Sequence, residues 1–74
     1  MMSKSIYSQR YRQVLEKLKK ARLEAGLTQK EVAKMLGKQQ AFISKIEIGE
    51  RRLDIVELFE FAKIYKKSIN YFID

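Results

Sequence analysis

The sequence predicts an all-α fold, a compact bundle of about five helices. Apolar residues recur three or four positions apart along most of the 74 residues, which is the spacing of one helix face. Helix-capping residues and glycines stand at the ends of these segments. No segment alternates between apolar and polar residues for long enough to be a strand.

The chain is short for a self-sufficient core. A chain of 74 residues has room for one domain, and it contains neither Cys nor His, so disulfides and the usual zinc sites are absent. Helix packing and self-association remain as stabilisers, and we therefore expect a homodimer. The lack of Cys fits a reducing cytoplasm, and no apolar run approaches the length of about 20 residues that a membrane span needs.

The N-terminal part predicts an arm followed by a helix. Residues 1–7 are polar and weakly periodic, so we interpret them as an arm that precedes a single domain over 8–74. Ser8 is a suitable N-cap, and Gly26 is a suitable helix end because the C′ position favours left-handed backbone. The predicted buried stripe of this helix consists of Val14, Leu18, Ala21 and Ala25.

Two short helices are predicted next. Thr28 and Glu31 match a capping box, and Gly37 ends the second helix only nine residues after its cap. The third helix then runs from about Gln39 to Ile48. The inward side chains of the two helices are predicted to be Val32, Ala33, Leu36, Phe42, Ile43 and Ile46.

The C-terminal part predicts two further helices. Asp54 and Glu57 form a second capping pair, and Ser68 can cap a last short helix, INYFID. The inward side of the fourth helix is predicted to contain Ile55, Leu58, Phe61, Ala62 and Tyr65. Not every apolar residue of these two helices can face inward, so some must form an exposed patch of the kind that marks interfaces.

Residues 29–48 match the requirements of two helices that cross at a sharp turn. Ala33 is small enough for a close crossing, and Gly37 tolerates positive φ in the turn. Together with GLTQKEVAKMLG, FISKIE and GERRLD, this stretch resembles the Cro and phage-repressor type of helix-turn-helix protein, the XRE-like regulators. The resemblance covers about residues 14–73 and implies a lambda-repressor-like DNA-binding domain whose third helix enters the major groove.

The resemblance also implies a set of site residues. By position, the residues that face the groove are Gln39, Gln40, Ala41, Ser44 and Lys45. Gln40 is the best single candidate, because a carboxamide can pair with N6 and N7 of adenine. The implied phosphate contacts are Gln29, Lys38, Arg51 and Arg52, and the implied structural ion pair is Arg22 with Glu47.

Similar proteins form dimers through the C-terminal helices. We accordingly expect a two-fold dimer that places two recognition helices about one DNA turn apart, roughly 34 Å. The expected interface residues are Phe59, Ile69, Tyr71, Phe72 and Ile73.

The chain departs from the family pattern at four positions. Ala41 stands where a small polar residue is common. Gln39 is a poorer helix cap than the usual Ser, Thr or Pro. Ile48 replaces a residue that is often polar or basic, and it would be exposed. Lys66 stands where a glycine is usual, so we expect the backbone before the last helix to close differently.

These observations predict a sequence-specific, dimeric regulator that binds a palindromic operator on double-stranded DNA, as a repressor or autoregulator. The net charge of +7 suits a polyanionic partner. The alternative is a protein-interaction module, an antitoxin or adaptor with the same fold; membrane binding is disfavoured because the core needs the apolar stripe of the first helix. Without His or Cys there is no support for an enzyme, and no cofactor or metal is expected. The expected location is the cytoplasm of a bacterium, at the nucleoid, with the gene in the bacterial or a phage genome.

Overall fold

The computed structural model describes residues 8–74, so the predicted arm over 1–7 lies outside the described residues. Five helices follow one another, as expected, and the predicted all-α fold is confirmed. In chain order they are α1 (Gln9–Glu24), α2 (Gln29–Leu36), α3 (Gln40–Glu47), α4 (Ile55–Tyr65) and α5 (Ile69–Ile73).

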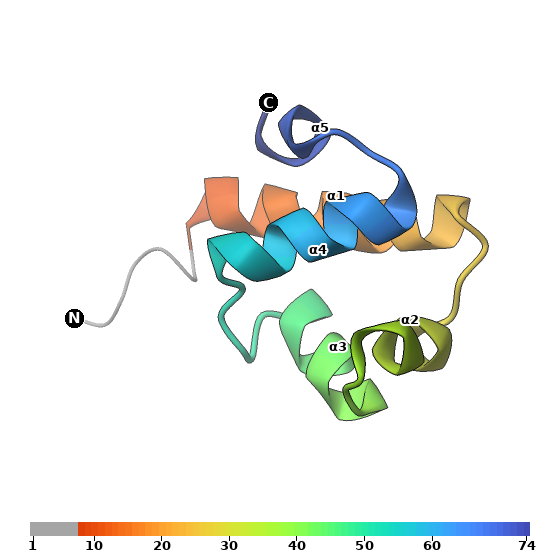
Figure 1. Ribbon diagram of the computed structural model, residues 1–74. Coiled ribbons are helices and arrows are strands. Elements are labelled where there is room, and N and C mark those ends of the chain that lie inside the picture. Colours follow the sequence, from red (N-terminus) through yellow and green to blue (C-terminus); the bar gives the residue numbers. More distant parts are fainter. Residues whose placement is uncertain (1–7) are drawn as a thin grey trace.

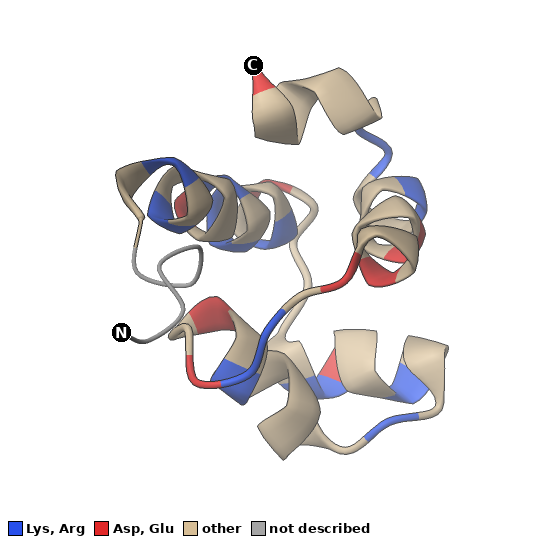
Figure 2. Ribbon diagram, turned by 90° about the vertical axis from the view of Figure 1, so that its left-hand side faces the viewer, with Lys and Arg blue, Asp and Glu red and all other residues tan. Residues whose placement is uncertain are grey.

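The helices are arranged around a central pair. α1 and α4 lie side by side in the middle of the molecule, with α2 and α3 on one side of them and α5 on the other (Figure 1). The turned view agrees, because α1 and α4 are there seen apart, with α5 above them and α2 and α3 below (Figure 2). The α2–α3 pair therefore forms one end of the molecule, where a long partner can reach it.

All five helices contribute to one core. Its fully buried side chains include Phe61 from α4 and Phe72 from α5. The remaining buried apolar residues are Leu15, Leu18, Ala21, Val32, Ala33, Ile43, Ile46, Leu58, Ala62 and Tyr65.

The predicted buried faces of α1 and α4 were wrong at three residues. Ala25 is exposed because α1 has ended by that residue, and Leu15, which the predicted stripe omitted, is buried instead. Ile55 is 61% exposed because it is the first residue of α4, and helical side chains tilt toward the helix N-terminus, so its side chain points past the end of the helix.

The predicted N-terminal caps of the first, second and fourth helices are confirmed. Ser8 Oγ accepts from the backbone N–H of Tyr11 at 3.0 Å. Full capping boxes open α2, with Thr28 and Glu31, and α4, with Asp54 and Glu57. These reciprocal bonds satisfy backbone donors that a helix start otherwise leaves to water.

Gln39 precedes α3 without a side-chain cap, as its poor capping character predicts, and α3 spans Gln40–Glu47, slightly less than expected. Ser68 is at the N-cap position of α5, but its side chain makes no capping hydrogen bond.

The expectation that the chain closes differently at Lys66 is wrong. Lys66 adopts the left-handed conformation that a glycine would adopt, with φ 58° and ψ 44°. The backbone N–H groups of Lys66 and Lys67 donate to the carbonyls of Lys63 and Ala62, at 3.3 and 2.9 Å, which is the usual left-handed helix end. The backbone hydrogen bonds therefore hold a non-glycine residue in a conformation that costs free energy.

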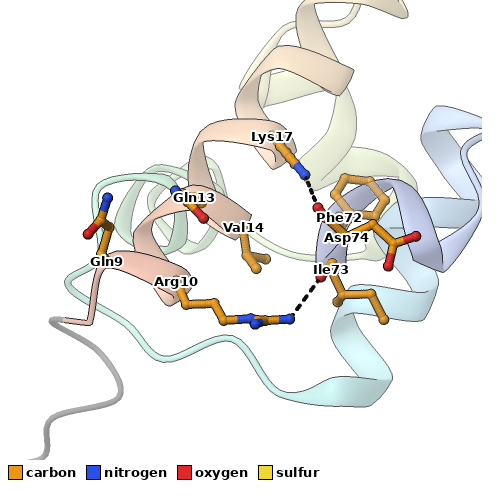
Figure 3. Close-up of a pocket in the computed structure, with 8 residues that line it drawn as sticks. All are labelled: Gln9, Arg10, Gln13, Val14, Lys17, Phe72, Ile73 and Asp74. Atoms are coloured by element: carbon orange, nitrogen blue, oxygen red, sulfur yellow. Dashed lines mark hydrogen bonds between the residues drawn. The ribbon is translucent and has the colours of Figure 1, made fainter.

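α5 is attached to the first half of α1. Arg10 Nη2 donates to the carbonyl of Ile73 at 3.2 Å, and Lys17 Nζ donates to the carbonyl oxygen of Asp74 at 3.0 Å. Val14 and Phe72 line the hollow between these two bonds (Figure 3). Cationic side chains thus bind the carbonyls at the C-terminal end of α5, where the helix dipole is negative.

Candidate nucleic-acid interface

α2 and α3 cross closely because the residues between them are small or fully buried. Ala33 is buried at the crossing, and Ile43 and Ile46 of α3 are completely inaccessible to solvent. Gly37, with φ 68°, supplies the turn, and the backbone N–H of Lys38 donates to the carbonyl of Ala33 at 2.8 Å. The inward side of α3 is therefore fully used for packing, and only its outer side can meet a ligand.

The outer side of α3 is polar. Gln39, Gln40, Ala41 and Lys45 are exposed, and Ser44 is half-buried. The structure thus brings the five residues predicted to contact bases onto the outer side of the helix and its N-cap. An eight-residue helix is about 12 Å long, which suits insertion across a major groove of similar width.

Gln40 is connected to the core by a chain of hydrogen bonds. Its Nε2 donates to Oε1 of Gln29, the first residue of α2, at 3.3 Å. Nε2 of Gln29 in turn donates to Oε1 of Glu47, at the end of α3, at 3.0 Å. Gln29 therefore lies between the predicted base contact and a buried carboxylate, an arrangement that the sequence did not reveal.

Glu47 is one partner of the predicted ion pair with Arg22, which is present. Nε and Nη2 of Arg22 donate to the two carboxylate oxygens at 2.7 and 3.2 Å, and both side chains are more than 90% buried. Nη1 of Arg22 also donates to the carbonyl of Leu27 at 2.9 Å, between α1 and α2. The hydrogen bond to Glu47 raises the pKa of the Arg22 guanidinium, which keeps that guanidinium charged.

Two predicted phosphate contacts lie beside one aromatic ring. Lys38 Nζ is 5.1 Å from the centre of the Phe42 ring, and the Arg51 guanidinium carbon is 4.5 Å from it. Arg51 also donates to Glu57 Oε1 at 3.0 Å. Phe42 therefore brings together cations that precede and follow α3, and one carboxylate offsets part of their charge.

The other predicted phosphate contact, Arg52, is exposed in the connection between α3 and α4. This connection is fixed to α1, because the Tyr11 hydroxyl accepts from the backbone N–H of Leu53 at 2.8 Å. Basic residues also occur along α1, away from the α2–α3 pair (Figure 2).

The five residues expected at a dimer interface do not share one environment. Phe59 is 55% exposed and Ile73 is 42% exposed, whereas Ile69 and Tyr71 are half-buried against the core. Phe72 is 1% exposed within a single chain, so its inclusion in the expected interface must be corrected: its side chain already belongs to the core. Ile55 and Val56 are exposed beside Phe59 at the start of α4, and we call these three residues the α4 patch.

Two further observations concern the rest of the described chain. Ile48 is exposed, as expected, and lines a hollow with Arg12, Leu15 and Lys19 of α1. Within residues 8–74, no helix combines the length and the apolar character that crossing a membrane requires.

A comparison with known proteins identifies the family. No curated protein matches the sequence. A family model described as helix-turn-helix matches residues 18–72, which include α2, α3, α4 and nearly all of α5. The match covers well over half of the chain, and its central part is the α2–α3 pair just described. The chain therefore belongs to the XRE-type, Cro/C1-like family of helix-turn-helix domains, which bind DNA and are not enzymes.

Proposed function

We propose that the protein is a transcriptional regulator that binds a palindromic operator as a homodimer, with the α3 helix of each chain in the major groove of one half-site. The observation that carries this proposal is the outer side of α3. It presents Gln40, held by Gln29, together with Ala41 and Lys45, on a helix whose opposite side is buried.

Each of these side chains has a base edge that it can recognise. The carboxamide of Gln40 can donate to N7 and accept from N6 of adenine. Lys45 can donate to guanine O6 or to a phosphate, and the methyl group of Ala41 can contact the thymine methyl. Gln39 and Ser44 flank these residues on the same helix and complete the proposed base contacts.

The phosphate contacts would surround these residues. Lys38 and Arg51 lie by the Phe42 ring, and Arg52 follows in the connection to α4. Gln29 uses one Nε2 hydrogen for Glu47 and retains the other for a phosphate oxygen. Such contacts set the affinity and the register on DNA, whereas the base contacts set the sequence preference.

Dimer formation would use the α4 patch together with Ile73. Three large apolar side chains at the start of α4 are more than half exposed, and neighbouring exposed apolar residues of this kind mark interaction surfaces. An isologous contact through this patch would bury it against itself and relate two α3 helices by a two-fold axis. A dimer bound over a promoter would act as a repressor or autoregulator.

The test is selection from random duplex DNA by the full chain, followed by binding measurements on the selected sequence. We expect a palindrome with half-sites about one turn apart. Gln40→Ala should weaken binding to that palindrome by about 1–3 kcal/mol while leaving binding to unrelated DNA unchanged. Equal weakening on both DNAs would contradict base contact by Gln40.

Lys38→Ala tests the phosphate contacts in the same assay. It should weaken binding to all sequences and lower the slope of log K against log salt by about one unit. Lys63→Ala, which removes an exposed charge from α4, is the matched control and should leave the slope unchanged. A slope that Lys38→Ala does not alter would remove Lys38 from the phosphate set.

Ile48 favours a second candidate function, a protein-interaction module such as an antitoxin or adaptor. It is 64% exposed at a position where related sequences often have a polar or basic residue. Enrichment of no sequence, with weak and salt-sensitive binding to every DNA, would support this candidate and contradict the operator-binding proposal.

A further inference from the structure

We propose that Phe42 is a positioning residue for the DNA backbone. Its ring holds Lys38 and Arg51 together beside the first turn of α3, and it leaves their hydrogen-bond donors free for the phosphates of one strand. The inference rests on the proposed function, because it concerns how the proposed phosphate contacts are arranged. It assigns a role in DNA affinity to a half-buried aromatic side chain that is not itself one of those contacts.

Arg51 returns toward the start of α3. The chain turns back after this helix, and the backbone N–H of Arg51 donates to the carbonyl of Lys45 at 3.1 Å. The guanidinium of Arg51 then lies over the ring of Phe42, in the first turn of the helix, with 4.5 Å between its carbon and the ring centre. A cation that follows α3 is thereby brought beside Lys38, which precedes it and whose Nζ is 5.1 Å from the same ring centre.

The ring offsets the repulsion between these two cations. The two charged groups cannot be farther apart than their distances to the ring centre added together, which is less than the length of α3. Like charges at such a separation repel each other. The face of an aromatic ring is negative and attracts each cation, so Phe42 favours an arrangement that Lys38 and Arg51 would otherwise avoid.

The ring also leaves the donors of both cations unused. Arg51 donates to Oε1 of Glu57 and to the carbonyl of Arg52, each at 3.0 Å, and both bonds come from Nη1. Within residues 8–74, the Nε and Nη2 donors of Arg51 and the Nζ donors of Lys38 have no acceptor. Nε and Nη2 form the edge of a guanidinium that can bind two oxygens of one phosphate, and stacking on a ring does not occupy this edge.

A phosphate backbone is the partner that these donors fit. Phosphate oxygens only accept hydrogen bonds, and their negative charge attracts both cations. Because Lys38 and Arg51 are already held in place, less side-chain entropy is lost when DNA binds. Phe42 should therefore raise the affinity for duplex DNA of any sequence, whereas the sequence preference is left to Gln40 and its neighbours.

The experiment changes the charge distribution of the ring and keeps its shape. Phe42 is replaced in the full chain by monofluoro-, difluoro- and pentafluorophenylalanine, because fluorine draws electrons from the ring face and weakens its attraction for cations in steps. Dissociation constants are measured at one low salt concentration for the selected operator and for unrelated duplex DNA. We expect both affinities to fall along the series, by about fivefold in the pentafluoro variant, while their ratio stays constant.

The same fluorinated residues at Phe61 are the matched control. Phe61 is buried in the core, and its ring stacks on that of Tyr65 with 5.8 Å between the ring centres. All measurements are made below the unfolding temperature of each variant. Fluorination at Phe61 should then leave the affinity for both DNAs unchanged.

A thermodynamic cycle determines whether Phe42 acts through the two cations. Phe42→Leu keeps an apolar side chain but removes the ring, and it should weaken binding to both DNAs by about fivefold. In the background of Lys38→Ala/Arg51→Ala, the same substitution should change binding by less than about twofold. An equal loss in both backgrounds would mean that Phe42 touches DNA or only supports the fold, and would overturn the inference.

The outcomes separate the inference from the proposed function. If a palindrome is selected but its affinity stays constant or rises along the fluorinated series, the inference is overturned and the proposed function stands. If no palindrome is selected but the affinity for duplex DNA falls along the series, the inference stands and the operator-binding proposal is contradicted. A chain that binds no duplex DNA would contradict both.

Discussion

The α2–α3 and α4–α5 pairs close their turns with the same backbone geometry but differ in how well the sequence suits it. In both, a left-handed residue follows the first helix, Gly37 after α2 and Lys66 after α4, with φ of 68° and 58°. The residue after each donates to the carbonyl five positions earlier, at 2.8 and 2.9 Å. The same turn is thus built once with the residue that favours it and once without.

The two pairs also differ in the polarity of the side chains that they expose. The outer side of α3 is polar, and hydrogen bonds connect it to a buried ion pair. The α4 patch is apolar and exposed, and the buried Tyr65 hydroxyl has no hydrogen-bond partner among the described residues. The exposed apolar side chains of the α4 patch are the feature of the α4–α5 pair on which the proposed dimer rests.

A large effect is expected from breaking the buried ion pair. Glu47→Ala leaves the Arg22 guanidinium buried without its partner and should lower the free energy of unfolding by about 3–5 kcal/mol. Urea unfolding followed by circular dichroism measures this change. The double variant Arg22→Met/Glu47→Leu removes both charges and should recover most of the loss; a double variant as unstable as Glu47→Ala would contradict this account.

Phe59→Lys tests the α4 patch. A charge at the centre of the patch should raise the dissociation constant of the proposed dimer at least tenfold, about 1.4 kcal/mol, without unfolding the chain. Sedimentation equilibrium measures the dissociation constant. Met35→Lys makes the same change at an exposed apolar residue of α2 and should have no effect.

Phe72→Asp should unfold the chain rather than dissociate a dimer, because Phe72 is in the core. A folded monomer from Phe72→Asp, or an unchanged dimer from Phe59→Lys, would contradict the assignment of these two residues.

Substitutions at the two left-handed residues should change the free energy of unfolding in opposite directions. Lys66→Gly relieves backbone strain and should stabilise the fold by up to about 1 kcal/mol. Gly37→Ala introduces the strain and should destabilise it by about 1 kcal/mol, and the added Cβ meets no atom within 4 Å that would complicate the comparison. Thermal unfolding measures both changes in stability. If both substitutions stabilised the fold, or both destabilised it, the two turns would not be equivalent.

The smallest effect is expected at Tyr65. Burial raises the pKa of its hydroxyl, so stability that is fully present below the unfolded pKa of about 10 is lost as the pH rises above it. Tyr65→Phe should change stability at neutral pH by less than about 1 kcal/mol, because the hydroxyl has no partner to lose, and should reduce the alkaline loss. An unaltered alkaline loss would exclude Tyr65 as its source.

Features that depend on neighbouring residues could be predicted from the sequence. The capping boxes at Thr28 and Asp54 and the turn at Gly37 involve residues within a few positions of one another. The Arg22–Glu47 pair was available only through the family resemblance, since its partners are 25 positions apart.

Features that depend on how helices cross could not be predicted. The contact of Gln29 with Gln40 requires the angle between α2 and α3. The burial of Leu15 requires the position of α3 and the residues after it against α1, and the burial of Phe72 requires the position of α5 against α1. The exposure of Ile55 likewise could not be predicted, because its helical spacing places it on the same face as the buried Leu58 and Ala62.

The attachment of α5 to α1 has a consequence for the order of folding during synthesis. Of the described helices, α1 leaves the ribosome first and α5 last, yet Phe72 fills the space beside Val14, and Arg10 binds the carbonyl of Ile73. At about 5–20 residues per second, α1 waits several seconds for this partner. We therefore expect the core to close around α1, and the domain to bind DNA in full, only after α5 has been synthesised and packed against α1.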